Sequence, residues 1–289
     1  MPRRPNWMKF DVVLKQESNI EQRASNVEHR SPGKSVEVPE GMQRYRAVVA
    51  YDGTAYAGWQ VQPGAVTIQG ELEAAVKQVT GEAARVQCSG RTDAGVHAVG
   101  QVAHFDLAKT FDLAKLRLSL NAVLPEDIRV LKVNRAKPDF HARFSPKGKE
   151  YRYFIWNAAV MPPHLRHYHY AVRKPLDAAA MRRAARLLTG RQDFAAFSAN
   201  PNREISGTVR HLHSLTVTKR GAEIVIRARG DGFLYKMVRS LAGFLIRVGA
   251  GELPPESART ILDSKLRTAT VPTAPPQGLF LWKVFYSRD

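Results

Sequence analysis

From residue 44 onward, the spacing of hydrophobic side chains changes repeatedly between the two-residue period of a strand and the longer period of a helix. Short segments rich in Val, Ile, Tyr and Phe predict strands. These segments are 44–51, 84–88, 100–105, 127–133, 151–156 and 278–286, together with a hairpin over 211–230 that turns at 219–222. The stretch HARFSPKGKEYRYFIW, residues 141–156, leads from a first group of elements into a second group that repeats the alternation.

Helical periodicity occupies the segments between these strands. The first helix is predicted to follow Thr67 and to end at Gly81, with its apolar residues on one face: Ile68, Leu72, Val76 and Val79. A second predicted helix contains Leu113, Leu116 and Leu120. A third covers 177–188, with Asp177 as its cap, and a fourth covers 233–251. The elements lack the strict βαβ order of a doubly wound sheet. The pattern therefore predicts an α+β fold of two similar halves, with mainly antiparallel sheets.

The first residues of the chain differ from the rest. Residues 1–42 lack periodicity and are polar and rich in turn formers, so we expect a disordered N-terminal extension. They contain neither the apolar core of a secretory signal nor the acid-poor composition of a transit peptide. Met42 stands directly before the first predicted strand and is a candidate for the native start. The predicted halves are residues 43–147 and 148–289.

The composition predicts a globular protein and argues against a membrane protein or a disulfide-stabilised one. Hydrophobic residues make up 44% of the chain, which is ordinary for a globular protein. No run approaches the roughly 18 apolar residues that span a bilayer, so we expect no membrane association. The single cysteine, Cys88, cannot form an intramolecular disulfide or a cysteine zinc cluster. A reducing compartment, the cytoplasm, fits best.

The net charge of the chain indicates what kind of partner the protein binds. The chain carries 44 Lys and Arg residues against 26 Asp and Glu residues, a formal net charge of +18. Residues 1–41 hold seven basic and six acidic residues, so the folded body carries almost all of the excess. A body this basic attracts a polyanion, most commonly a nucleic acid. The alternative is an adaptation for solubility without a specific partner.

The loop CSGRTDAGVHAVG, residues 88–100, holds the strongest candidate for chemistry. It places Arg91, Asp93 and His97 within seven residues, and Gly90 and Gly95 flank the segment with Arg91 and Asp93. An Asp in a glycine-rich loop usually stabilises a turn. It can instead act as a nucleophile if it stays ionised in a partly dry pocket, and an arginine supplied from elsewhere would favour that form.

Arg239 is the candidate for that arginine. On its predicted helix it lies on an apolar flank beside the core stripe, together with Tyr235, Ala242 and Ile246. A guanidinium in such a setting either reaches solvent or meets a carboxylate, and the spacing alone leaves both readings open.

Basic and aromatic residues alternate in the segment 141–154. Such a segment suits RNA, because aromatic faces stack on bases while Lys and Arg bind phosphates. The alternative is a strand with aromatic residues in the core and charges in water. Tyr151 and Tyr153 share one strand face, so one of them is a candidate core residue. The basic and aromatic members are Arg143, Phe144, Lys147, Lys149, Tyr151, Arg152 and Tyr153.

Other chemistries find little support in the sequence. His164, His167 and His169 follow two prolines without an acidic or cysteine ligand beside them, so no metal site is expected. Glycine-rich phosphate loops, dinucleotide fingerprints and serine nucleophile elbows do not occur. No cofactor is expected.

Five blocks of the chain together resemble the tRNA pseudouridine synthase A family. They are YDGTAYAGWQ, GRTDAGVHA with the following GQVAHF, HARFS followed by YRY, DGFLYKMVR, and GLFLWKV. The resemblance covers residues 44–286 in order and spacing. The segment SANPNREISGTVR, residues 198–210, is less distinctive, and residues before Met42 have no counterpart.

The resemblance implies a function for each candidate. Asp93 would be the catalytic nucleophile that converts uridine to pseudouridine in the anticodon stem-loop of tRNA, at positions 38, 39 and 40. Arg239 would keep Asp93 charged, and Tyr151 would stack on the target base and handle its proton. Arg91 would help to flip the nucleotide, and Leu279 would pack against the pocket. No cofactor is implied, since substrate and product are isomers.

The family fold is also α+β, with two similar halves that place their sheets side by side around a basic central cleft. Its members act as homodimers, so a homodimer is implied here. Two alternatives remain open. One is a non-catalytic RNA-binding module in which Asp93 is a turn residue. The other is a hydrolase with an aspartyl intermediate, which would require a nearby second Asp for magnesium that GRTDAGVH lacks.

Overall fold

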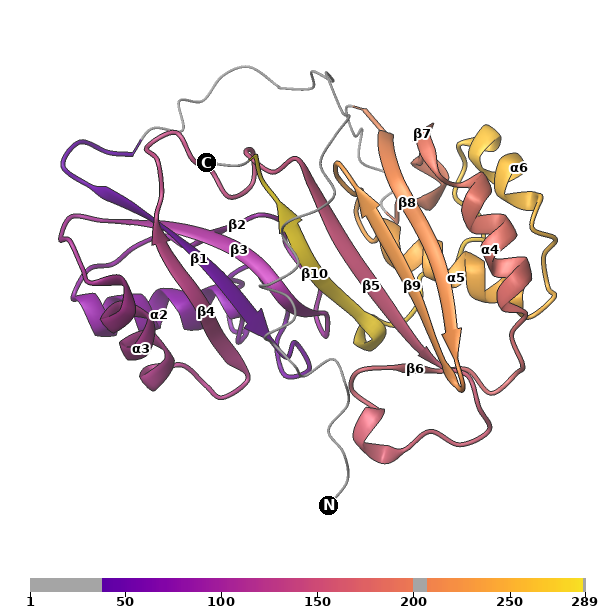
Figure 1. The fold of residues 1–289 in the computed structure, drawn as a ribbon, viewed down its shortest axis with the longest axis horizontal. Coiled ribbons are helices and arrows are strands. Elements are labelled where there is room, and N and C mark those ends of the chain that lie inside the picture. Colours follow the sequence, from indigo (N-terminus) through magenta and orange to yellow (C-terminus); the bar gives the residue numbers. More distant parts are fainter. Residues whose placement is uncertain (1–37, 200–206, 288–289) are drawn as a thin grey trace. The chain divides into compact units, whose positions relative to one another are not determined.

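A ten-stranded, mostly antiparallel sheet organises the protein (Figure 1). The computed structural model describes residues 38–199 and 207–287, all within one unit, residues 36–289. The main strand order is β4-β1-β3-β10-β5-β9-β8-β7, with β2 paired to β3 and β6 paired to β5. The strands are β1 Gln43–Tyr51, β2 Gln87–Cys88, β3 His97–Leu107, β4 Ile128–Arg135, β5 Gly148–Trp156, β6 Tyr170–Ala171, β7 Gly190–Asp193, β8 Val209–Arg220, β9 Glu223–Gly230 and β10 Leu279–Phe285. The predicted α+β class with mainly antiparallel pairing is confirmed.

The last strand occupies the middle of the sheet. β10 pairs in parallel with β3 through Phe280 and Leu281, and antiparallel with β5 over its whole length. Strands β1 to β4 therefore lie on one side of β10, and strands β5 to β9 on the other (Figure 1). A residue on β3 and a residue on β5 can approach each other only across β10.

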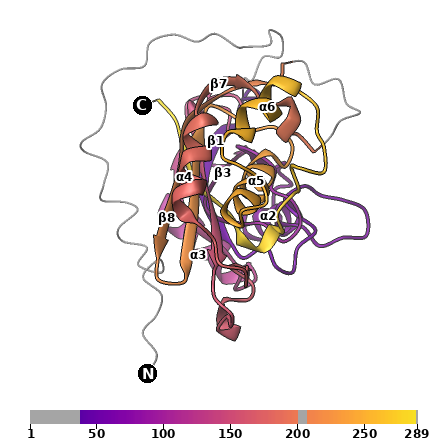
Figure 2. The same ribbon diagram turned by 90° about the vertical axis from the view of Figure 1, so that its right-hand side faces the viewer.

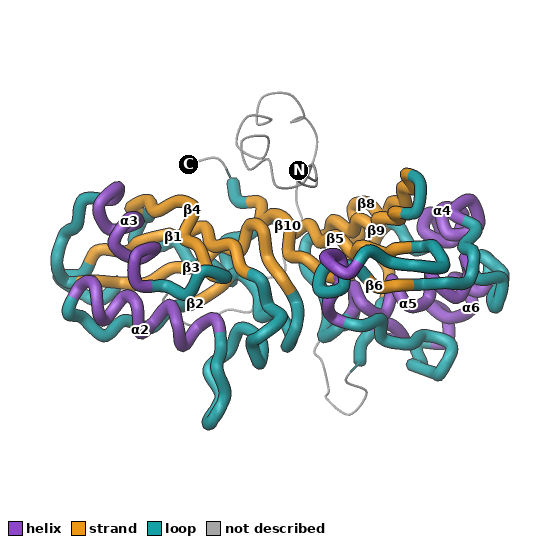
Figure 3. The backbone as a smooth tube through the Cα atoms, turned by 90° about the horizontal axis from the view of Figure 1, so that it is seen from below, coloured by secondary structure: helices purple, strands orange, loops and turns teal. Residues whose placement is uncertain are grey.

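Helices cover one face of this sheet in two groups. Figures 2 and 3 show α2 and α5 on the same side of the strands. The α-helices are α2 Ile68–Thr80, α3 Leu113–Val123, α4 Ala178–Leu187, α5 Met237–Gly249 and α6 Ser257–Ser264, and the 3-10 turns are η2 Pro163–Leu165, η3 Ala195–Phe197 and η4 Pro276–Gly278. The predicted caps are present: the Thr67 side chain accepts a hydrogen bond from the Gly70 amide, and Asp177 accepts from Ala179 and Ala180.

The core lies between the helices and the sheet. β1 alternates buried and less buried residues, and its inward side chains are Tyr45, Ala47, Val49 and Tyr51. Burying each such large apolar side chain contributes about 1.5–3 kcal/mol. The buried residues of both strand groups form one continuous hydrophobic cluster. In the described part of the chain, no helix combines the length and apolarity needed to cross a membrane.

Two local predictions need correction. The helix expected over 233–251 begins only at Met237, because Lys236 adopts a left-handed backbone with φ 54. The strand expected over 84–88 shrinks to β2, since the side chains of Glu73 and Gln69 bind the backbone of Val86 in place of a neighbouring strand.

The pattern also missed α6, β6 and β7. These elements are short, and α6 follows a Pro-Pro pair without a side-chain cap. Residues 1–37 of the N-terminal extension predicted over 1–42, and the part of SANPNREISGTVR at 200–206, lie outside the described residues.

Candidate active site

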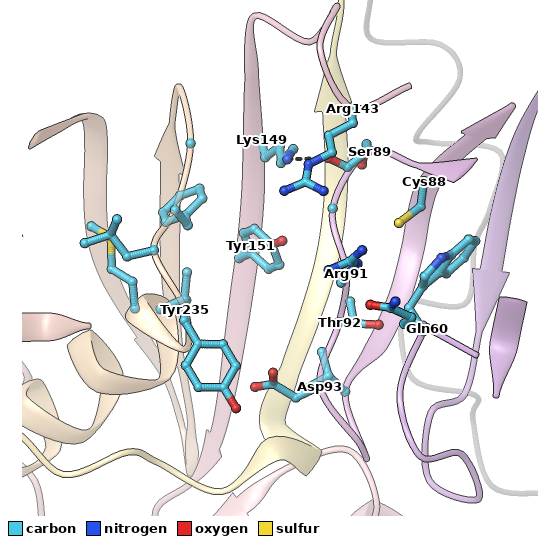
Figure 4. Close-up of a pocket in the computed structure, with 18 of the residues that line it drawn as sticks. Gln60, Cys88, Ser89, Arg91, Thr92, Asp93, Arg143, Lys149, Tyr151 and Tyr235 are labelled. Atoms are coloured by element: carbon cyan, nitrogen blue, oxygen red, sulfur yellow. Dashed lines mark hydrogen bonds between the residues drawn. The ribbon is translucent and has the colours of Figure 1, made fainter. Parts of the chain in front are cut away.

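The candidate site is a pocket of about 740 Å³ that brings the sequence candidates together. Figure 4 shows its walls, which come from the loop after β2, from β5, and from the segment that precedes α5. Asp93, Arg239, Tyr151, Arg91 and Leu279 all line it. Among the described residues, the pocket lining contains seven Lys and Arg side chains but only two carboxylates, those of Asp93 and Asp231. A cavity with this charge balance attracts anions.

Backbone contacts hold the Asp93 loop in place. The Trp59 amide donates to the carbonyl of Thr92 at 3.0 Å, and the Val96 amide donates to the carbonyl of Asp93 at 3.2 Å. Gly58 makes the first contact possible: it has φ +97, and a Cβ there would lie 2.8 Å from the Thr92 oxygen. Gly95 turns the chain with φ +73. Gly58 and Gly95 thus allow the tight turn and the close backbone contact that hold the Asp93 loop.

Arg239 forms an ion pair with Asp93. Its Nη1 lies 2.8 Å from Asp93 Oδ2, and its Nε donates to the carbonyl of Ala274, also at 2.8 Å. The side chains are 11% exposed for Arg239 and 25% exposed for Asp93. The sequence left open whether Arg239 reaches solvent or meets a carboxylate; in the structure it contacts the carboxylate of Asp93.

Tyr151 and Leu279 form an apolar wall beside Asp93. Both are buried, on the adjacent strands β5 and β10. The Tyr151 ring meets Phe233 edge to face at 5.1 Å between centroids. Burial raises the pKa of the Tyr151 hydroxyl, so it stays protonated and can donate a hydrogen bond. Tyr153, on the same strand face, is the core residue of the pair, with its hydroxyl bound to the carbonyl of Pro275.

Exposed cations line the mouth of the pocket. Arg91 and Arg143 are both exposed, and in Figure 4 Arg143 lies above Tyr151 while Arg91 lies to its right. Phe144, next to Arg143, is 67% exposed and stacks on His141 at 4.3 Å. Exposed aromatic rings beside guanidinium groups suit unpaired bases and phosphates.

His97 shares the loop with Asp93 in sequence but not the pocket. It is fully buried, accepts a hydrogen bond from the Gly53 amide at 3.0 Å, and stacks on Phe280 at 4.6 Å. Asp52 lies 3.1 Å from its Nδ1. His97 therefore anchors the start of β3. In the histidine-rich segment, His169 contacts the carboxylate of Glu223 at 3.1 Å.

Reasoning from the sequence gave two pocket residues no place beside Asp93: it put Tyr235 on the predicted helix and Lys149 among the basic residues of the RNA-facing segment. Tyr235 is 50% exposed and lies opposite Asp93 in the lower part of the pocket in Figure 4. It can take this position because the chain at Tyr235 is not yet helical: α5 begins at Met237. Lys149 lines the upper wall and donates to the carbonyl of Ser89. Its position two residues before Tyr151 was the available signal, because alternate residues of a strand share a face.

An α+β sheet whose basic, aromatic pocket surrounds one arginine-paired carboxylate is the arrangement of an enzyme that acts on a nucleic acid. Residues 47–145 and 184–287 match the model of the tRNA pseudouridine synthase family, and the chain belongs to this family. The resemblance drawn from the five sequence blocks is thereby confirmed.

Curated relatives cover almost the same region. The tRNA pseudouridine synthase A of Brevibacillus brevis is 46% identical over 245 residues, which are 85% of this chain and 100% of the relative. The protein of that name from Geobacillus kaustophilus is 44% identical over 86% of this chain and 96% of its own length. The one from Halalkalibacterium halodurans is 45% identical over 82% of this chain and 90% of its own length.

Proposed function

We propose that the protein isomerises uridine to pseudouridine in tRNA, with Asp93 as the catalytic nucleophile. The observation that carries the proposal is the Asp93 carboxylate, which Arg239 contacts at 2.8 Å inside a pocket rich in cations. A carboxylate attacks as a nucleophile in its ionised form, and Arg239 is the ion-pair partner of Asp93. Family membership and the curated relatives support the reaction.

The reaction conserves every atom of the base except one exchanged hydrogen. The bond from N1 of uracil to the ribose carbon breaks, the base turns over, and C5 bonds to the same carbon. The hydrogen of C5 is released to solvent as a proton, and N1 takes up a proton. The isomerisation thus consumes neither an oxidant nor a co-substrate.

The remaining pocket residues receive roles that their positions support. Tyr151 stacks on the target base and handles its proton, since its hydroxyl stays protonated. Arg91, exposed two residues before Asp93, occupies the place of the flipped nucleotide. Flipping costs a few kcal/mol, least where the stem is already flexible. Leu279 forms the apolar floor beside Tyr151.

The same proposal includes the finer points of architecture and partner. The substrate region is the anticodon stem-loop, and the protein acts as a homodimer in the cytoplasm. Residues 43–147 and 148–289 form two similar halves around a basic central cleft, and the position of β10 between the two strand groups supports this division.

Tritium release tests the reaction directly. Unmodified tRNA labelled with tritium at uridine C5 is incubated with wild-type protein and, in parallel, with the Asp93→Asn variant. We expect release from the wild type and none from the variant, while both bind tRNA with similar affinity. Unchanged release from Asp93→Asn would refute the nucleophile assignment. Binding without release by the wild type would favour the alternative, a non-catalytic RNA-binding module.

A further inference from the structure

Lys149 reaches from β5 across β10 to the loop that carries Asp93. Its Nζ donates to the carbonyl of Ser89 at 2.6 Å, the contact drawn as a dashed line in Figure 4. Ser89 is fully buried and stands four residues before Asp93. Among the residues that the structure describes, no carboxylate lies within ion-pair distance of Lys149. A carbonyl of the Asp93 loop is therefore the partner of this cation.

Gly90 shows how closely the ammonium group fits beneath the loop. A Cβ on Gly90 would lie 3.0 Å from Lys149 Nζ, 3.7 Å from its Cε and 3.9 Å from the Tyr151 hydroxyl oxygen. Any larger residue would press on the ammonium group. The absence of a side chain at Gly90 thus leaves the space that Lys149 occupies.

The opposite side of the loop is held by neutral hydrogen bonds. The Ser89 hydroxyl donates to Gln101 Oε1 at 2.7 Å, and Gln101 Nε2 donates to the carbonyl of Gly90 at 2.8 Å. The hydroxyls of Thr92 and Tyr51 are 2.8 Å apart. These contacts come from β1 and β3. Lys149 fixes the same segment from the other strand group.

The electrostatic setting strengthens this contact. Burial lowers the pKa of Lys149 to about 8, so the amine is still largely protonated at neutral pH. A cationic donor makes a stronger hydrogen bond to a carbonyl than a neutral one does. Arg91 and Arg143, in contrast, are exposed and free to meet a phosphate. The geometry thus favours a loop contact over a phosphate contact for Lys149.

We propose that Lys149 is a positioning residue of the reaction, which holds the carbonyl of Ser89 and thereby orients the loop 89–92 that presents Asp93 to the target uridine. The inference rests on the proposed function for its catalytic consequence. It assigns to Lys149 an effect on turnover rather than on tRNA affinity.

Variants of Lys149 separate these effects. Lys149→Met removes the donor but keeps the length of the side chain. We expect kcat for tritium release to fall by about 10- to 100-fold, the size of effect that a misplacement near 1 Å produces. The Kd for tRNA should stay within about twofold of wild type. Lys149→Arg keeps the charge but not the fit under Gly90, and we expect it to leave kcat low.

Lys132→Met is the matched control, because Lys132 is an exposed lysine of strand β4 and lies outside the pocket lining. Its kcat should equal that of the wild type. Gly90→Ala is the second approach, since it crowds the ammonium group while Lys149 is intact; we expect reduced kcat with unchanged Kd. If Lys149→Met fails to fold, the kcat of Gly90→Ala tests the positioning role of Lys149 in its place.

Cys88 provides a readout that does not depend on turnover. It is the only cysteine of the chain, it is buried, and it directly precedes Ser89. Burial raises the pKa of its thiol to about 12, and the charge of Lys149 acts to lower that pKa. Electrostatics alone would therefore slow thiol modification in Lys149→Met. We expect modification by an aromatic disulfide to become at least several-fold faster, because the loop opens.

The outcomes distinguish the proposals. A Kd for tRNA raised tenfold with unchanged kcat, restored by Lys149→Arg, would assign Lys149 to a phosphate and overturn the positioning role. The positioning role would also be overturned if Lys149→Met had the kcat of the wild type. Where Lys149→Met does not fold, an unchanged kcat of Gly90→Ala would overturn that role. If the wild type releases no tritium, the proposed function fails, and the rate of Cys88 modification alone then supports or refutes the contact with the loop.

Discussion

The ion pair between Asp93 and Arg239 should contribute measurably to stability as well as to chemistry. Exposed pairs couple by about 0.2–1 kcal/mol, whereas removing one partner of a fully buried pair costs about 3–5 kcal/mol. With side chains 25% and 11% exposed and one contact of 2.8 Å, this pair lies between those limits. We expect a coupling free energy of about 1–2 kcal/mol.

A double-mutant cycle measures that coupling. The free energy of unfolding is obtained from urea denaturation of wild type, Asp93→Asn, Arg239→Met and the double variant. The cycle cancels the hydrogen bond from Arg239 to Ala274, because both variants at position 239 lose it. Arg239→Met alone should destabilise the fold, since it leaves the carboxylate without its partner.

The pair of Arg44 and Asp106 is the matched control within the same sheet. It has two contacts of 2.8 Å and side chains only 5% and 20% exposed. Its cycle should give the larger coupling, about 2–3 kcal/mol. If the control couples strongly while Asp93 and Arg239 couple by less than about 0.5 kcal/mol, solvent screens the active-site pair and the reasoning from its burial is wrong.

Two further predictions concern salt and pH. The affinity for tRNA should fall steeply with salt, with a slope of about −3 to −6 in a plot of log K against log salt if four to seven cations meet phosphates; a flat response would contradict the basic pocket as a binding surface. Burial acts to raise the pKa of Asp52, but its contact with His97 and the hydrogen bonds from Thr54 and Tyr168 outweigh burial and lower that pKa. The stabilisation is therefore present above the unfolded value of 3.8 and is lost as pH falls below it. Asp52→Asn should cost more stability at pH 7 than at pH 3 by urea denaturation, and an equal cost at both would contradict the assignment.

Much of the fold could be predicted because local patterns decided it. Thr67 and Gly81 mark the two ends of α2 by cap chemistry that needs no tertiary context. The position of β10 between β3 and β5 could not be derived in this way, since strand order depends on contacts between residues far apart in sequence. The start of α5 was also out of reach, because a lysine rarely adopts the left-handed backbone found at Lys236.

The candidate site was predictable to a similar extent. Asp93 stood out by its glycine-flanked loop, and the five family blocks pointed to its neighbours in the pocket. From spacing alone, Arg239 had two open readings, because a helix face does not reveal what stands opposite. The role now proposed for Lys149 depends on its contact with Ser89, which lies 60 residues away in the chain. No local pattern records such a contact.

The central place of β10 has a consequence for how the protein is made. Residues 279–285 are synthesised after all the other strands that the structure describes, yet they join β3 to β5. While the nascent chain lacks them, the two strand groups have no common sheet, and Lys149 has no fixed path to Ser89. The N-terminal group can fold early during synthesis, as domains generally do. The active site can instead assemble only once residues 279–285 have been made, so a chain truncated before residue 279 would lack a complete catalytic centre.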